Sequence, residues 1–164
     1  MDEDLVSAES VHDLVGRYAE AKSRQDTQAA LRLCTDDFLL HTEAVHNTTV
    51  GKRNVRRLLD AFFGIFPDYH VTLDDSVLNG YGYTCWGTLR MTMRGRLGPW
   101  PATHRTATLP FVCVFTIREG LIASEHFFFD RYEMCDALGL PSARFERLSR
   151  IVARIPPRLL RSAL

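Results

Sequence analysis

The residues best suited to chemistry lie on one predicted strand near the end of the chain. Alternation along a β-strand places His126 and Asp130 on the same face of the run 121–130, with Phe128 between them. Imidazole and carboxylate groups can exchange protons with a substrate near neutral pH, as general acid–base catalysis requires. Because burying such groups without partners is costly, the pattern indicates a pocket with a polar tip. The alternative is an ordinary amphipathic strand whose polar face lies in water.

Long antiparallel strands would position these residues. Glycine turns between β-rich runs predict two hairpins, with strands at 69–78 and 81–94 joined at Asn79-Gly80, and a second hairpin over 103–132 that turns at 118–120. In the strand 81–94, Trp86 would share a face with polar residues. A tryptophan on a pocket wall would stack on a flat substrate, although a tryptophan in a strand is also an ordinary core residue.

The first half of the chain is predicted to be mainly helical. Apolar residues recur at helical spacing in three segments, at about 7–25, 26–35 and 51–66, with a short strand at 38–42, and a last short helix is expected at 132–138. Helices followed by long antiparallel strands define an α+β fold. A strongly curved sheet wrapped around the helices would enclose one cavity, and such cavities bind small ligands.

Composition narrows the class of protein. The chain has 164 residues, enough for one domain, and 20 basic residues balance 20 acidic residues, which does not favour nucleic-acid binding. The four cysteines are widely spaced and lack the spacing of metal ligands, as expected of a reduced intracellular protein. Neither a signal peptide nor a run long enough to cross a bilayer is recognisable. We expect a cytoplasmic protein without a metal.

The end of the chain has a different character. Apolar residues recur at helical spacing in 142–161, with six arginines mainly between them. A basic amphipathic helix can bind an anionic membrane or an acidic partner, for example a carrier protein that presents a tethered substrate. It can also simply pack over the domain or form a dimer interface, which is the interpretation we favour.

Three segments resemble a known family. They are LVGRYAEAKSRQDTQAALRLCTDDFLLH (14–41), VGKRNVRRLLDAFFGIFPDYHV (50–71) and FTIREGLIASEHFFFDRYEMCDALGL (115–140), and they are similar to segments of the nuclear transport factor 2-like superfamily, within it the SnoaL-like polyketide cyclases. The resemblance implies a cone-shaped sheet wrapped around three helices over residues 1–140, a deep apolar pocket and a C-terminal extension at 141–164. It also implies a homodimer formed through the outer sheet face, and ring closure by an intramolecular aldol reaction without metal or organic cofactor.

The resemblance points to Asp130 as the acid–base group. In the cyclases the aspartate usually stands two residues after the histidine of a Glu-His pair, where this chain has Phe128, and here the aspartate follows at Asp130. His126 would orient the substrate or assist the proton transfer. The alternatives are that Asp130 caps the helix that begins near Tyr132, and that His126 is a core residue with a satisfied hydrogen bond.

Further residues are expected to line the pocket. The predicted substrate-binding set is Tyr18, His41, Trp86, His104, Arg105, Phe111 and Phe128. Tyr18 matches a tyrosine that stabilises an enolate in the steroid isomerases of the superfamily. The positions of the isomerase base and of its second acid are occupied here by Thr42 and Cys113, so the steroid-isomerase mechanism is not predicted in that form.

The sequence therefore predicts a cofactor-free cyclase or isomerase that acts on an apolar, polyketide-like molecule. An epoxide hydrolase-like or dehydratase-like enzyme is the first alternative, and it would need a second acid, for which Glu43 is the candidate. A small-molecule binding module without catalysis is the second.

Overall fold

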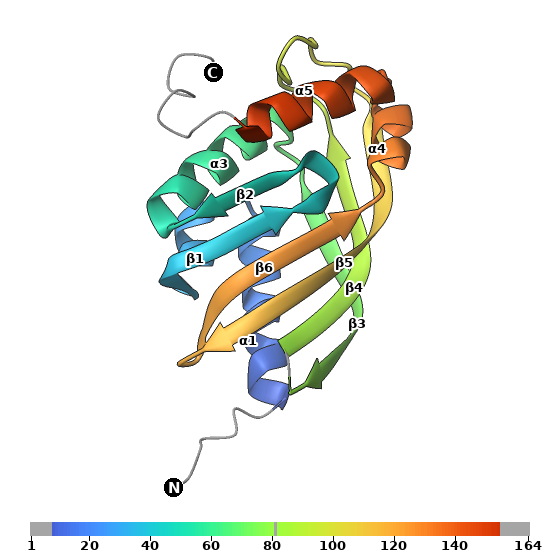
Figure 1. The fold of residues 1–164 in the computed structure, drawn as a ribbon. Helices are drawn as coiled ribbons and strands as arrows, with labels where there is room; N and C mark the ends of the chain where they lie inside the picture. Colours follow the sequence, from blue (N-terminus) through green and yellow to red (C-terminus); the bar gives the residue numbers. More distant parts are fainter. Residues whose placement is uncertain (1–7, 81, 155–164) are drawn as a thin grey trace, which may run out of the picture.

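The computed structural model describes residues 8–80 and 82–154 (Figure 1). Five α-helices and a 3-10 turn combine with six strands, in the order α1 (Ala8–Ser23), α2 (Thr27–Arg32), β1 (Cys34–Thr42), η1 (Glu43–Val45), β2 (Asn47–Val50), α3 (Lys52–Ile65), β3 (His70–Asn79), β4 (Gly82–Thr92), β5 (Thr106–Arg118), β6 (Leu121–Phe129), α4 (Arg131–Leu138) and α5 (Ser142–Arg154). The predicted α+β class, with a curved sheet wrapped around helices, is confirmed.

The six strands form a single sheet in the order β2-β1-β6-β5-β4-β3. All neighbours are antiparallel except β1 and β6, which run parallel, and this pairing brings the N-terminal half of the chain to the C-terminal hairpin. Both predicted hairpins are present, β3–β4 and β5–β6. The structure adds β2, whose four residues, NTTV, are too few to show an alternating pattern in the sequence.

Helices cover only one face of the sheet, and the core lies between them (Figure 1). Alternate residues of β4 and β5 point into this core, including Tyr83, Cys85, Phe111 and Phe115, which are at most 4% exposed. The other set faces away from the helices, and there Trp86, Val112 and Phe128 are about 40% exposed. The face that the helices cover is therefore the concave, apolar one, and the outer face carries both polar and apolar side chains.

Local signals explain where the helices begin and end. The side chain of Asp26 accepts a hydrogen bond from the backbone of Ala29 and so caps α2. Asp130 does the same for α4, since its carboxylate accepts hydrogen bonds from the backbone N–H groups of Tyr132 and Glu133. Gly139 ends α4 in the left-handed conformation that glycine adopts without strain.

Helix α5 packs back onto the domain. Phe145 is buried against Trp100 with their rings 5.7 Å apart, and Glu146 forms an ion pair of 3.2 Å with Arg131 of α4. The predicted tail helix thus exists as far as Arg154, and the remainder of that prediction, from Ile155 to Arg161, lies outside the described residues. Among the helices of the described ranges, none has the length and apolarity needed to span a bilayer.

The four cysteines are free thiols, and all four are buried. Burial raises the pKa of Cys34 to about 12 and that of Cys135 to about 11, so very little thiolate forms at mildly alkaline pH. We expect the native protein to react with Ellman's reagent far more slowly than the denatured protein, which should release four equivalents. Rapid reaction of one native thiol would show that its surroundings open readily.

Candidate active site

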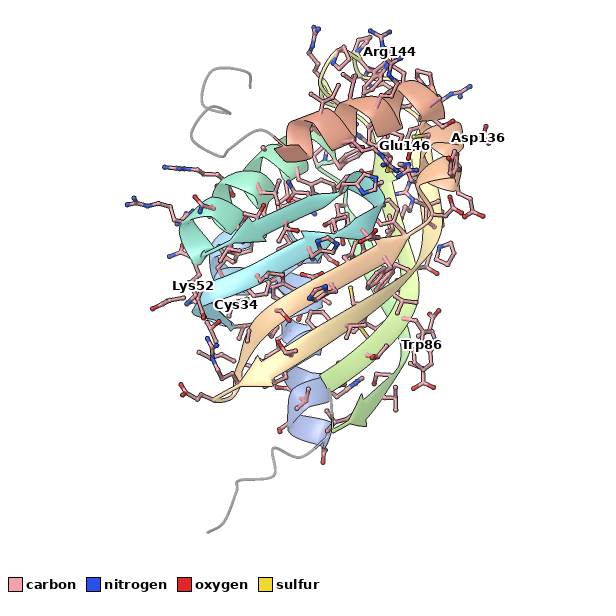
Figure 2. The ribbon with its side chains drawn as sticks, in the orientation of Figure 1. Cys34, Lys52, Trp86, Asp136, Arg144 and Glu146 are labelled. Atoms are coloured by element: carbon pink, nitrogen blue, oxygen red, sulfur yellow. The ribbon has the colours of Figure 1, made fainter. Side chains whose placement is uncertain are left out.

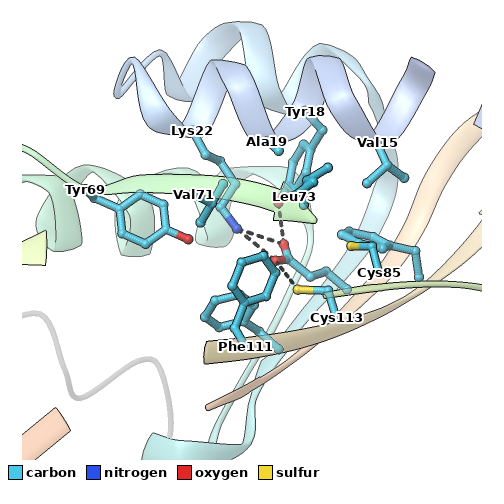
Figure 3. A pocket seen from close by; sticks show the side chains of 13 residues that line it. Val15, Tyr18, Ala19, Lys22, Tyr69, Val71, Leu73, Cys85, Phe111 and Cys113 are labelled. Carbon is cyan, nitrogen blue, oxygen red and sulfur yellow. Dashed lines mark hydrogen bonds and ion pairs between the residues drawn. The ribbon is translucent and has the colours of Figure 1, made fainter. Parts of the chain in front are cut away.

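A carboxylate lies at the centre of the core. Glu125 of β6 is 1% exposed, and its oxygens accept hydrogen bonds from Tyr18 Oη at 2.6 Å and from Lys22 Nζ at 2.8 and 3.1 Å. Cys113 Sγ, on the neighbouring strand β5, lies 3.6 Å from Glu125 Oε1. Figure 3 shows Tyr18 and Lys22 reaching from α1 into this interior, with these bonds as dashed lines. The carboxylate, an ammonium and a phenol therefore form one enclosed cluster.

The three side chains meet because two elements present the right faces. Tyr18 and Lys22 are four residues apart on α1, so they lie on the same side of the helix, and that side also carries buried Val11 and Val15. Glu125 points inward from β6 because a bulge in this strand changes its alternation between Ile122 and Ser124. The buried side of α1 and the inner face of the sheet therefore face each other, and the three polar groups meet between them.

The charges and the burial of this cluster shift the pKa values of Lys22 and Tyr18. Burial alone would lower the pKa of Lys22, but the charge of Glu125 outweighs it and leaves this pKa above its ordinary value. The stabilisation that Lys22 gains is therefore present at neutral pH, below the ordinary lysine pKa of about 10, and is lost as the pH rises through its elevated pKa. The pKa of Tyr18 is raised by burial and then by the Glu125 charge, so Tyr18 remains a neutral hydrogen-bond donor.

A small cavity adjoins the cluster. Its volume is about 20 Å³, enough for roughly one water molecule. Besides the cluster it is lined mainly by apolar groups, among them Phe111, Phe115 and Phe127. Tyr69 also lines it, and Figure 3 shows its hydroxyl turned towards Lys22. The lining residues Ala19, Val71 and Leu73 are only half-buried, so the seam between α1 and β3 is the thin side of the cavity.

Two of the predicted site residues lie in this interior, namely Tyr18 and Phe111. Asp130 lies outside the interior cavity, and its exposed side chain accepts the capping hydrogen bonds of α4, as the alternative interpretation predicts. His126 does share the outer face with Asp130, but that face is directed away from the helices. The ring of His126 lies 5.5 Å from that of His41 on β1.

The other predicted residues also lie outside the cavity. His41 bonds Thr48 and Glu43 on the outer side, at 2.7 Å each, while Trp86 and Phe128 are each 38% exposed, and His104 and Arg105 precede β5 as exposed residues. Asp130, Phe128 and Glu43 line a shallow surface hollow of about 270 Å³ near η1. Alternation identifies the two faces of a strand but not which face the helices cover, so the sequence could not place these residues inside or outside the cavity.

Sequence reasoning missed Glu125 and Lys22, although both left a signal. Glu125 is the single charged residue in the otherwise apolar alternate series of β6, which continues with Phe127 and Phe129. Lys22 continues the apolar stripe of α1 one turn beyond Tyr18. An isolated charge within an apolar face indicates a buried, paired group. Among the described residues, no three His, Cys, Asp or Glu side chains are arranged to hold a metal ion.

The fold and the enclosed acid define an α+β cone of the nuclear transport factor 2-like kind. The model of the SnoaL-like polyketide cyclases matches residues 12–138, and the chain belongs to that family. A comparison with curated protein sequences gives no significant match.

Solved structures agree on the fold. A protein from Catenulispora acidiphila DSM 44928 with a ketosteroid isomerase-like fold, in complex with trimethylamine, is 18% identical with a TM-score of 0.70, covering 80% of this chain and 95% of its own. TsrD from Streptomyces laurentii is 21% identical with a TM-score of 0.71, and the match covers 82% of this chain and 98% of TsrD. An NTF2-like protein of unknown function from Burkholderia pseudomallei K96243 is 21% identical with a TM-score of 0.67, and the match covers 79% of this chain and 97% of that protein.

Proposed function

We propose that the protein is a cofactor-independent acid–base enzyme that closes a ring in, or isomerises, an apolar polyketide-like molecule. Membership of the SnoaL-like polyketide cyclase family supports this class of reaction. The observation that carries the proposal is the Glu125 carboxylate, enclosed in the core with two hydrogen-bond donors beside a cavity. A buried ion pair contributes little to stability compared with apolar side chains, so a catalytic role accounts for its presence better than a structural one.

Glu125 would accept a proton from the carbon next to a substrate carbonyl. The negative charge then moves to the carbonyl oxygen as an enolate, and Lys22 and Tyr18 are close enough to transfer their hydrogen bonds to that oxygen. The net charge of the cavity is the same before and after this step. The enolate carbon attacks a second carbonyl of the same molecule, a carbon–carbon bond forms, and the resulting alkoxide takes the proton back from Glu125.

A substrate needs more room than the present cavity offers. A volume of about 20 Å³ does not admit a ring, so binding requires displacement of side chains at the seam between α1 and β3. Val71 and Leu73 are partly exposed there and are the side chains we expect to move. This opening would place the substrate against Glu125 and still exclude bulk water.

The proposal is tested by hydrogen–deuterium exchange into α-tetralone, a bicyclic aryl ketone with slow background exchange, followed by proton NMR. We expect the wild-type protein to accelerate exchange and Glu125→Gln to lose about 100-fold or more of the enzymatic rate. Asp130→Asn, which keeps a capping side chain, is the matched control and should exchange like the wild type. Equal rates for Glu125→Gln and the wild type, or loss in Asp130→Asn alone, would contradict the assignment.

The mainly apolar lining of the cavity also suits a second function, that of a small-molecule binding module without catalysis. In that case α-tetralone shifts the NMR signals of the protein with similar affinity in the wild type and in Glu125→Gln, and neither protein accelerates exchange. The two functions therefore give different results in the same experiment.

A further inference from the structure

Arginines at one end of the molecule are left without carboxylate partners. Elsewhere most described arginines form ion pairs, including Arg17–Asp13, Arg24–Glu20, Arg56–Asp60, Arg90–Asp68 and Arg118–Asp37. By contrast, within residues 8–80 and 82–154 no carboxylate lies within ion-pair distance of Arg96, Arg105, Arg144 or Arg147, and all four are exposed. We name these four residues the arginine surface. In a chain with no net charge, this is a local excess of positive charge.

Packing around Trp100 brings Arg144, Arg147 and Arg96 to the same end of the molecule. The Arg144 guanidinium lies over the Trp100 ring, 6.0 Å from its centroid, and Arg147 is one turn further along the same side of α5. Trp100 belongs to the tight turn that it closes with Leu97 by two backbone hydrogen bonds of 3.0 Å, and Arg96 bonds the carbonyl of Gly98 within that turn.

Arg105 lies at the junction of α4 and α5. A Cβ at Gly139 would lie 2.7 Å from its guanidinium, so Arg105 covers the end of α4 just before α5 begins. Glu146, the acidic residue of α5, does not neutralise the surface, because it is already paired with Arg131 and Arg150. Figure 2 shows Arg144 at the end of the molecule formed by α5, well away from Lys52 at the start of α3.

We propose that the arginine surface docks an acidic protein surface. Guanidinium groups spread along a helix and a neighbouring turn match carboxylates that are distributed in the same way on a partner. The interior cavity and the hollow near η1 are both lined by other residues than the four arginines. The docking surface is separate from the interior cavity, and its test does not depend on the proposed activity.

Two other polyanions fit the surface less well. The apolar side of α5 packs onto the domain at Phe145, which is 6% exposed, and the exposed Ile151, at 53%, is by itself too small an apolar surface to insert into a membrane. Nucleic-acid binding is disfavoured by the balanced charge of the chain, and Trp100 is covered by Phe145 and Arg144 and cannot stack on a base.

The test measures binding of fluorescein-labelled poly-L-glutamate to the full chain by fluorescence anisotropy at low and physiological salt. We expect binding that weakens with salt and falls by about tenfold or more in Arg144→Glu/Arg147→Glu. The matched control is Arg53→Glu/Arg57→Glu on α3, which changes the net charge equally at two exposed arginines and should keep at least half of the affinity. Circular dichroism verifies that both variants fold.

Three results would overturn the proposal. One is equal loss in the two double variants, because it would show that net charge alone drives binding. Another is tighter binding of a DNA duplex or of phosphatidylserine vesicles than of poly-L-glutamate, which would assign the surface to a different partner. The third is absence of poly-L-glutamate binding at low salt.

Discussion

Replacing Lys22 by Met is expected to lower the free energy of unfolding by about 3–5 kcal/mol. The change removes the ammonium that bonds Glu125 at 2.8 and 3.1 Å and leaves the carboxylate in a core where it is 1% exposed. A buried charge without its counter-charge loses its hydration without compensation, which is why removal of one partner costs so much. Urea unfolding followed by circular dichroism measures the change through the midpoint and the m-value.

A triple variant separates the cost of the lone charge from the value of the pair. In Lys22→Met/Glu125→Met/Tyr18→Phe the whole cluster becomes apolar, and no donor or acceptor of these three residues is left unpaired. We expect its stability to lie within about 1 kcal/mol of the wild type, or above it. If Lys22→Met alone costs less than about 1 kcal/mol, water reaches Glu125 and the cluster is not enclosed.

This pair of results bears directly on function. An apolar cluster that is as stable as the natural one, but that does not accelerate exchange into α-tetralone, would mean that the ion pair is not needed for folding. The charged groups would then be explained by the reaction they perform. Conversely, a triple variant that cannot fold would make the cluster structural and would remove the main support for the proposed activity.

The failure of sequence reasoning at the site has a specific structural cause. Alternation groups Ile122 with His126 and Asp130 on one face of the strand. In the structure β6 contains an extra residue, since Thr116 pairs with Ser124 and Ile117 pairs with Ile122. Ile122 is fully buried, and beyond the bulge the inward series continues with Glu125. Alternation alone does not locate a one-residue bulge, so it cannot assign Ile122 and Glu125 to the same inner face.

The elements themselves were easier to predict because their signals are local. The turn at Asn79-Gly80 and the helical stripe of α3 depend on neighbouring residues, and both occur close to the expected positions. The interior position of Tyr18 also followed from the stripe of α1. Which side chains meet across the core depends on the β1–β6 pairing, which joins residues far apart in the chain and cannot be read from spacing.

Replacing Gly87 by Ala is expected to destabilise the protein by about 3 kcal/mol or more, or to prevent folding. Gly87 lies opposite a bulge in β3 between Leu73 and Asp75, and a Cβ there would overlap the backbone carbonyl oxygen of Thr72. Because the obstacle is backbone in the middle of a sheet, no side-chain rotation relieves it, and the pairing of β3 with β4 must change.

The matched control is Gly64→Ala in α3, where a Cβ meets nothing within 4 Å. Alanine is the better helix former, so this variant should be more stable than the wild type by up to about 1 kcal/mol. Opposite signs for the same chemical change, measured by urea unfolding, would show that close backbone contact at Gly87 causes the loss. A neutral Gly87→Ala would contradict the β3–β4 register. That register also places Leu73 at the thin side of the cavity. A partly folded Gly87→Ala protein should therefore expose the cavity to solvent, and its Cys85 and Cys113 should react with Ellman's reagent faster than in the wild type.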